Sequence, residues 1–130
     1  MLRRSALKRG ERLKPVSDKR REENGAHRDV RMALAARDRG RCLLEGREAW
    51  GTDGKERVGP CAGPWTPHHV EKAWKGGAYD LDNLLTLCAR HNTWVEDEPD
   101  LAWMMGLVQR AGDTPEGCAR RRVVQWGLGR

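Results

Sequence analysis

The sequence predicts a small α+β protein, in which a pair of short strands and a helix surround metal-binding side chains and a longer helix precedes them. Three observations support this prediction. Cysteine and histidine recur at short spacing between Cys61 and Pro99, as in proteins that bind divalent cations. A Gly-Gly turn at Gly76-Gly77 separates an extended segment from a second apolar run. At 130 residues the chain buries only a modest core, so we expect an additional stabilising cross-link.

The N-terminal part predicts an arm followed by a helix. Residues 1–16 contain basic residues, a glycine and a proline without sustained periodicity, which indicates a basic flexible arm. Ser17 is a typical N-cap, and residues 17–40 are predicted to form the N-terminal helix, with Gly40 as its stop. We expect Asn24-Gly25 to interrupt the first half of this helix.

The following elements are shorter. Five glycines and two prolines between residues 46 and 64 indicate a long loop that needs a tether. Thr66 to Val70 and a nearby segment predict a hairpin-like strand pair. A helix is expected from Leu84 or Leu87 through Val95, ended by Pro99 nearby. Leu101 to Val108 predicts a short apolar helix or extended segment, and residues 112–117 have the composition of a turn.

Large apolar side chains are scarce except for tryptophan. Hydrophobic residues make up 38% of the chain, with no Phe, one Tyr and six Trp. We expect the tryptophans to form most of the large apolar surface of the core, whereas the alternative is that they are stacking platforms for bases. The six are Trp50, Trp65, Trp74, Trp94, Trp103 and Trp126.

Charge is distributed unevenly along the chain, whose formal net charge is +6. Residues 1–41 contain 14 Lys and Arg against 6 Asp and Glu, residues 42–119 contain 7 against 13, and residues 120–130 contain 4 basic residues and no acids. Basic ends around an acidic middle favour nucleic acid as a partner, because basic side chains neutralise phosphates. The alternative is that the basic ends only keep the protein soluble.

The four cysteines favour a metal site over disulfides. No apolar run approaches the roughly 20 residues that span a bilayer, and no secretion signal is recognisable, so we expect a soluble cytoplasmic protein. Disulfides are rare in that compartment. Cys88 and His91 lie three residues apart, on one face of the expected helix, and Cys42 and Cys61 would complete a Cys3His zinc site. Cys42 and Cys61 could instead be small buried residues, and Cys118 is isolated among polar residues and is expected to bind nothing.

A second, harder set of ligands is offered by the next residues of the same helix. Asn92 and Glu96 share a face rotated by roughly a quarter turn, at about 100° per residue. With His68 they could hold Mg2+ or Mn2+, although Glu96 could also be part of a solvated acidic helix end. On a strand His68 and His69 point to opposite faces, which suits His68 as the ligand and His69 as the base that activates water.

The string HHV…GG…DNLLTLCARHNTWVEDEP closely resembles the HNH endonucleases, in particular the small zinc-stabilised HNH proteins of phages and prophages. The resemblance covers residues 41–100, the predicted HNH nuclease core, and leaves residues 101–130 as a C-terminal extension with a basic tail. It implies a ββα-metal fold with a structural zinc site. It also implies that His69 is the general base, that His68 binds the catalytic ion, and that Asn83 orients the base.

Two departures from the family pattern bear on the ligands. Glu45 stands where the family has the second cysteine of its strand-side pair, so Cys61 would have to replace it. The family reads Cys-x-x-Cys-His, whereas this chain has Cys88-Ala-Arg-His-Asn. Alignment by spacing puts His91 on the zinc and makes Asn92 the last motif residue, an HNN variant. Alignment by residue identity would make His91 the ligand of the catalytic ion.

The resemblance implies a metal-dependent endonuclease that nicks or cleaves double-stranded DNA with Mg2+, Mn2+ or Ni2+, beside a structural Zn2+. Lys72, Lys75 and Arg90 are candidates for binding the flanking phosphates, and the alternative is that they are solvated surface charges. We expect a phage-encoded monomer that acts beside terminase subunits in the cytoplasm of the bacterial host. A restriction-like or homing activity is the alternative. The alternative is a non-catalytic, zinc-stabilised DNA-binding module, which would need the zinc ligands but neither His69 nor Asn83.

Overall fold

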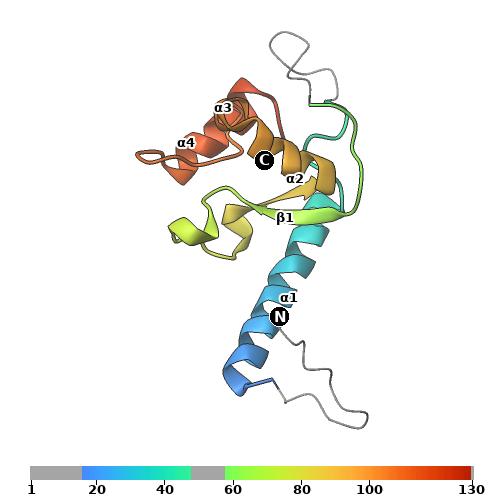
Figure 1. The fold of residues 1–130 in the computed structure, drawn as a ribbon, viewed down its shortest axis with the longest axis vertical. Helices are drawn as coiled ribbons and strands as arrows, with labels where there is room; N and C mark the ends of the chain where they lie inside the picture. The colour runs from blue at the N-terminus through green and yellow to red at the C-terminus, as the bar shows by residue number, and fades with distance from the viewer. Residues whose placement is uncertain (1–15, 48–57, 130) are drawn as a thin grey trace, which may run out of the picture.

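A two-stranded antiparallel sheet and a set of helices make up the computed structural model, which describes residues 16–47 and 58–129 (Figure 1). The protein is therefore of mixed α/β structure and small. The predicted arm, apart from Val16, lies outside the described residues. In chain order the elements are α1 (Asp18–Asp38), β1 (Trp65–His69), the 3-10 turns η1 (Ala73–Lys75) and η2 (Leu81–Asn83), β2 (Leu84–Cys88), α2 (Ala89–Asp97), α3 (Pro99–Met104), α4 (Pro115–Arg120) and a π-helical turn η3 (Arg121–Gln125).

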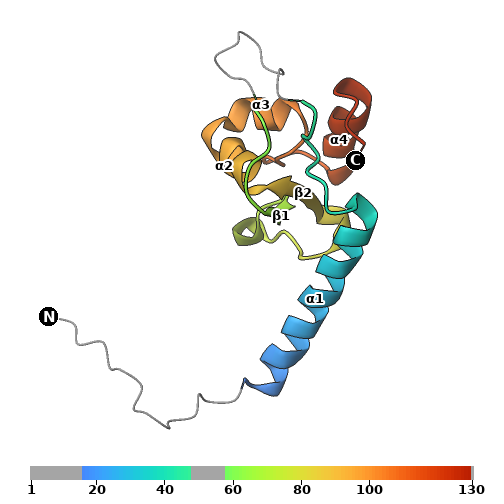
Figure 2. The ribbon, with the colours of Figure 1, turned by 90° about the vertical axis from the view of Figure 1, so that its right-hand side faces the viewer.

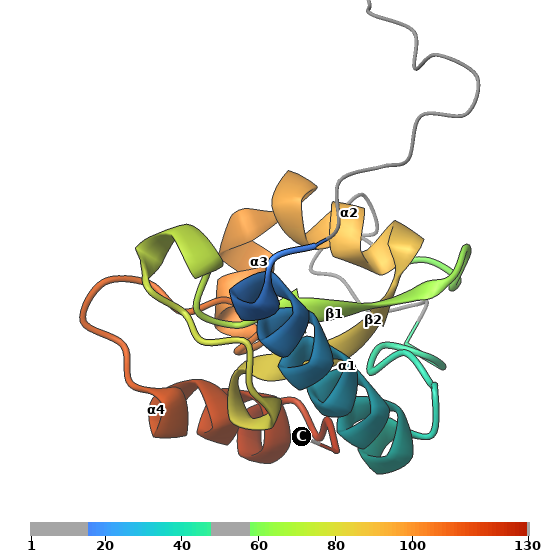
Figure 3. The same ribbon diagram turned by 90° about the horizontal axis from the view of Figure 1, so that it is seen from below.

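The sheet lies between α1 and α2 (Figures 2 and 3). Its register pairs Trp65 with Cys88 and His69 with Leu84. Because side chains alternate along a strand, His68 faces α2 while Trp65 and His69 face the side of α1. The predicted strand at Thr66 to Val70 is thus present, displaced by one residue.

The expected helix from Leu84 or Leu87 is wrong over residues 84–88, which form β2. All five side chains of this strand are buried, because one face packs on α1 and the other on the core. A strand covered on both sides loses its polar alternation and reads like a buried helix. Helix α2 starts only at Ala89, with Cys88 as its N-cap, and Pro99 begins α3 as its first residue rather than only ending α2.

The core lies between the sheet and the C-terminal helices. It consists of buried side chains that include Leu44, Val58, Val70, Leu85, Leu87, Trp94, Val95, Leu101, Met105, Leu107, Cys118 and Leu128. Cys118 is fully buried in this core, although its neighbours in the sequence are polar. The expectation that the tryptophans are core holds for Trp94 and is wrong for Trp74, which is 80% exposed.

Helix α1 is continuous through Asn24-Gly25, so the expected interruption is wrong. Its N-cap is Ser17, whose side chain accepts a hydrogen bond from the backbone of Arg20. Leu34 is its only buried residue, so most of α1 extends away from the core (Figure 2). Its last turn is fixed, because the Arg37 guanidinium donates to the carbonyl oxygens of Leu81 and Leu84. No helix of the described ranges combines the length and apolar character needed to cross a membrane.

Candidate functional site

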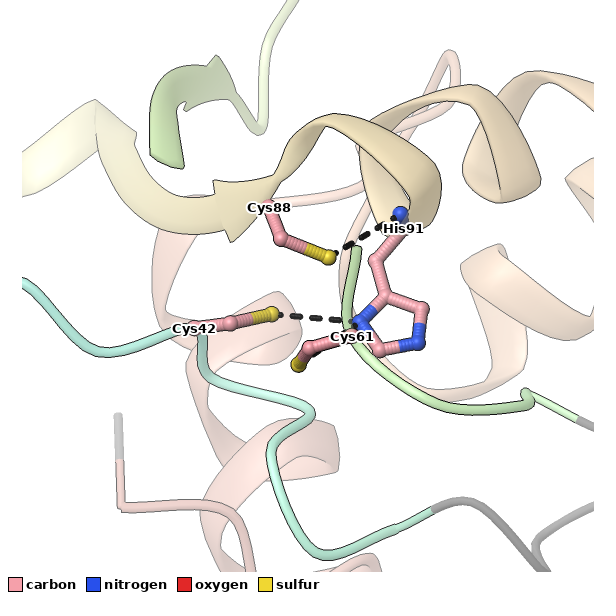
Figure 4. Close-up of side chains that lie close together, drawn as sticks. All are labelled: Cys42, Cys61, Cys88 and His91. Carbon is pink, nitrogen blue, oxygen red and sulfur yellow. Dashed lines mark hydrogen bonds between the residues drawn. The ribbon is translucent and has the colours of Figure 1, made fainter. Parts of the chain in front are cut away.

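Four predicted ligands, Cys42, Cys61, Cys88 and His91, converge at the junction of β2 and α2 (Figure 4). Cys42 arrives from the segment after α1, which is held against β2 by a hydrogen bond from Leu43 N to Thr86 O. Cys61 precedes β1. Cys88 ends β2, and His91 lies in the first turn of α2. Residues from both ends of the glycine-rich region and from the ββα unit thus meet at one point.

The segment that carries Cys61 is fixed by the N-terminus of α2. Backbone N–H groups in the first turn of a helix lack partners within the helix. Here Ala89 N donates to Pro64 O and Arg90 N donates to Ala62 O, at 2.8 and 3.1 Å. Gly63 allows this close approach: its φ is +78°, and an added Cβ would lie 2.8 Å from the Ala89 Cβ.

The separations between the ligand atoms suit a tetrahedral metal centre. His91 Nδ1 lies 3.2 Å from Cys42 Sγ and 3.6 Å from Cys61 Sγ, and all four ligand atoms lie within 4.8 Å of one another. Zinc with bonds of about 2.3 Å to sulfur and 2.0–2.1 Å to nitrogen requires ligand separations of about 3.6–3.8 Å. The cluster can therefore hold a metal ion with only small adjustments.

His91 has the orientation of a metal ligand. Its ring is fully buried, and Nε2 lies 2.8 Å from the carbonyl oxygen of Gly59. A carbonyl oxygen only accepts, so Nε2 carries the hydrogen and Nδ1 directs its lone pair at the sulfurs. Metal-bound histidines usually donate their second N–H to such a carbonyl.

The thiol of Cys61 resists ionisation when no cation is present. Desolvation, together with the neighbouring Cys42 and Cys88, raises the pKa of Cys61 to about 12. Cys88 Sγ accepts a hydrogen bond from the backbone N–H of His91. A cation would offset the repulsion between thiolates, so metal binding here releases protons.

His68 and Asn92 form a second pair of ligand-type side chains, on the α2 face of the sheet. His68 is 2% exposed, and its Nε2 lies 2.7 Å from Leu107 O. That contact puts the hydrogen on Nε2 and leaves the Nδ1 lone pair facing Asn92 Oδ1 at 3.2 Å. Burial lowers the pKa of His68, which favours the neutral ring that a metal needs.

His91 lies in the cysteine cluster, as the alignment by spacing predicts, whereas the role of Asn92 as the last motif residue stays a prediction. His91 is turned towards the thiols and Asn92 towards His68. Consecutive residues of a helix differ by about 100° in direction, so a single turn of α2 serves both clusters.

His69 is half-buried on the other face of β1, the face directed towards α1. Its ring centroid lies 5.5 Å from that of Tyr79, which in turn lies 4.2 Å from that of His27 on α1. Desolvation, with smaller contributions from Lys72 and His27, lowers the pKa of His69, so its neutral form extends to lower pH. A neutral imidazole is the form that can accept a proton.

Asn83 cross-links the loop that follows β1. Its Nδ2 donates to the carbonyl oxygens of Glu71 and Ala78, both at 3.0 Å, and its Oδ1 accepts from Glu71 N at 2.8 Å. One side chain thus satisfies three backbone groups of the loop that begins two residues after His69. The role of Asn83 in orienting His69 as a base stays a prediction.

Glu96 and the predicted phosphate-binding residues lie outside the two clusters described above. Glu96 pairs with Lys72, and its side chain is 63% exposed; no hydrogen bond among the described residues joins it to His68 or Asn92. Lys75 contacts the Trp74 ring at 4.8 Å. Arg90 is exposed and lies over Gly59. Lys72 is thus engaged within the protein, whereas Lys75 and Arg90 stay at the surface.

Four groups of this region escaped the sequence-based prediction. The carbonyl oxygens of Gly59 and Leu107, which set the tautomers of His91 and His68, are backbone atoms and leave no signal in residue types. Tyr79 and His27 lie beside His69 although 52 positions separate Tyr79 from His27 in the sequence. That Tyr79 is the only tyrosine was the one available hint.

Comparisons of the chain with protein-family models, with curated proteins and with solved structures give no match.

Proposed function

We propose that this protein is a metal-dependent endonuclease of the HNH type, with β1, β2 and α2 as its ββα-metal unit and duplex DNA as the expected substrate. The observation that carries this proposal is the meeting of His68 Nδ1 and Asn92 Oδ1 at 3.2 Å, because two acceptor atoms facing each other are suited to share a cation. His69 follows immediately, and Asn83 braces the loop after it. A setting in phage DNA packaging rests on the sequence resemblance alone.

The chemistry assigned to this chain is phosphodiester hydrolysis. A divalent cation held by His68 and Asn92 would supply Lewis-acid stabilisation of the negative charge that develops on the phosphate and the leaving 3′ oxygen. Neutral His69 accepts the proton of the attacking water. Leu107 O holds the His68 ring in the tautomer that leaves Nδ1 unprotonated.

The two histidines face opposite sides of the sheet, which restricts where the scissile phosphate can lie. Within the described residues β1 pairs only with β2, so its other edge has no strand partner. A phosphate placed along that edge is accessible from both faces of the strand. We therefore place the scissile phosphate at the outer edge of β1, near its His68-His69 end.

The four-ligand cluster is assigned to a structural zinc ion. Three sulfurs and one imidazole fill every position of a tetrahedral zinc, so none is left for substrate. Its role would be to tie the segments carrying Cys42 and Cys61 to the junction of β2 and α2.

The test is nicking of supercoiled plasmid by the full chain with Mg2+, Mn2+ or Ni2+ added, beside His69→Ala. We expect metal-dependent nicking by the parent and a loss of about 10²-fold or more in the variant. Zinc content and melting temperature of both proteins show that the variant remains folded. If the parent binds DNA but nicks with none of the three metals, the protein is a binding module and the nuclease proposal is wrong; if His69→Ala nicks at the parental rate, His69 is not the base.

A further inference from the structure

A hollow of the described surface lies between α1 and the α1-facing side of β1, next to His69. It is an open groove of about 590 Å3, within the roughly 300–1,000 Å3 of sites that hold small organic groups. Its walls come from one face of α1, from the first residue of β1 and from the loop that Asn83 braces. The residues used below are His27, Arg28, Arg31, Met32, Trp65 and Tyr79.

The groove is continuous with the proposed reaction centre. Trp65 and His69 lie on the same face of β1, four residues apart, because side chains alternate along the strand. Tyr79 lines the groove and also contacts the ring of His69. A polymer whose phosphate lies at His69 therefore continues past Tyr79 towards Trp65.

The chemistry of the groove matches one strand of nucleic acid with exposed bases. Trp65 and Tyr79 offer aromatic surfaces, and Met32, which is 66% exposed, adds an apolar one. Arg28 and Arg31 line it and are exposed, and no carboxylate of residues 16–47 or 58–129 lines it. Aromatic surfaces bind bases by stacking and guanidinium groups bind phosphates, a combination typical of sites for single strands.

Neither arginine is engaged in an ion pair within residues 16–47 and 58–129. Arg31 lies 5.8 Å from the centroid of the Trp65 ring, near the roughly 6 Å limit of a cation–π contact, so this contact is weak. Bases paired within a duplex cannot present their faces to Trp65 and Tyr79. The aromatic lining therefore suits an unpaired strand, whose bases can stack on it, better than a duplex.

We propose that this groove binds an unpaired DNA strand that leads away from the scissile phosphate, so that the preferred substrate is a forked, flapped or gapped duplex. This inference rests on the proposed nuclease function and sharpens its substrate class. From His69 to Trp65 the strand rises about 13 Å, which is at most about four nucleotides at the duplex rise of 3.4 Å each and fewer in an extended strand. An unpaired segment of up to about four nucleotides would fill the groove.

The test is binding of fluorescently labelled DNA to the zinc-loaded full chain without added divalent cation, so that no cleavage is needed. The probes are a blunt duplex and duplexes with 5′ or 3′ unpaired arms of two, four and eight nucleotides. We expect one arm polarity to bind more tightly than the blunt duplex, with the gain complete at about four nucleotides. Trp65→Leu should weaken binding of the armed duplex by about 5- to 150-fold, which corresponds to loss of one stacked base, and leave the blunt duplex unchanged.

Arg28→Gln and Arg31→Gln keep the proposal testable if Trp65→Leu fails to fold, because both arginines are exposed. Each should reduce the salt dependence of armed-duplex binding by about one phosphate contact. Arg120→Gln, on α4, removes the same charge outside the groove and is the matched control. Equal effects of all three substitutions, or equal binding of blunt and armed duplexes, would overturn the groove proposal. Plasmid nicking without a preference for arms refutes the groove alone, whereas arm-specific binding without nicking supports the groove and refutes the nuclease.

Discussion

Replacement of the exposed ligand Cys61 by serine separates the effect of metal binding from the effect of packing. Cys61 is exposed, so the substitution removes little buried surface, yet it removes one of the four side chains that could hold a metal ion. A ligand that binds only the folded state stabilises it by about 4.1 kcal/mol when its free concentration is 1,000 times the dissociation constant. Small domains have a total stability of about 5–15 kcal/mol, so losing this contribution is severe.

The expected effect is a fall in melting temperature of roughly 10–20 °C, at about 3–5 °C per kcal/mol for a chain of this size. Metal content by elemental analysis should fall from one zinc per chain to well below one. A chelator should lower the melting temperature of the parent towards that of Cys61→Ser and change the variant little.

The matched control is Cys118→Ser. Cys118 is fully buried and lies outside the group of four side chains that could hold a metal ion. Its Sγ accepts a hydrogen bond from Arg121 Nη2, which a serine hydroxyl can also accept. We expect full zinc content and a loss of about 1–3 kcal/mol from burying a hydroxyl. The reasoning fails if Cys61→Ser keeps one equivalent of zinc and melts with the parent.

Three further predictions concern the loop beside His69 and the C-terminal part. Asn83→Ala leaves three backbone groups of the loop without their hydrogen-bond partner, so it should misplace the base and lower the nicking rate by up to about 10²-fold. Zinc content should not change, and a parental nicking rate would show that Asn83 is not part of the site. Gly77→Ala places a Cβ against the Glu71 carbonyl and should reduce nicking by displacing the same loop. Its control is Gly25→Ala in α1, where an added Cβ meets open space and should raise stability by about 0.5–1 kcal/mol. Similar melting temperatures and nicking rates of the two variants would contradict this prediction. Hydrogen bonds from Arg110 N and Trp103 Nε1 lower the pKa of Asp113, so its carboxylate stabilises the fold above the unfolded-state pKa, and this stability is lost as pH falls through the lower folded-state pKa. Asp113→Asn should therefore be less stable than the parent at pH 7, with a difference that shrinks in acid. Urea unfolding at several pH values measures this difference, and a difference that stays constant with pH would refute the reasoning.

The sequence predicted the metal cluster better than the elements that carry it. Cys88 and His91 are close in the chain, and few other sulfur or imidazole groups compete as partners, so residue type and spacing sufficed to bring Cys42 and Cys61 into the same site. The strand Leu84–Cys88 was misread because burial on both faces removes the alternation that distinguishes a strand.

Contacts between distant segments were beyond reach for a different reason. The groove depends on the angle at which α1 leaves the sheet, to which the hydrogen bonds of Arg37 to Leu81 and Leu84 contribute. The residues near Arg37 in the sequence do not predict these hydrogen-bond partners, which lie more than 40 positions away. The pairing of Glu96 with Lys72 is similarly long-range, and it explains why a carboxylate at helical spacing from Asn92 is directed elsewhere.

The consecutive positions of His91 and Asn92 make the proposed chemistry sensitive to oxidants. Cys61 is exposed, and oxidation of a metal-bound thiolate removes a ligand and releases the ion. The turn of α2 that loses its anchor at His91 is the turn that presents Asn92 to His68. Loss of a ligand from this cluster would therefore also disturb the pair His68 and Asn92, to which the proposed function assigns the catalytic ion.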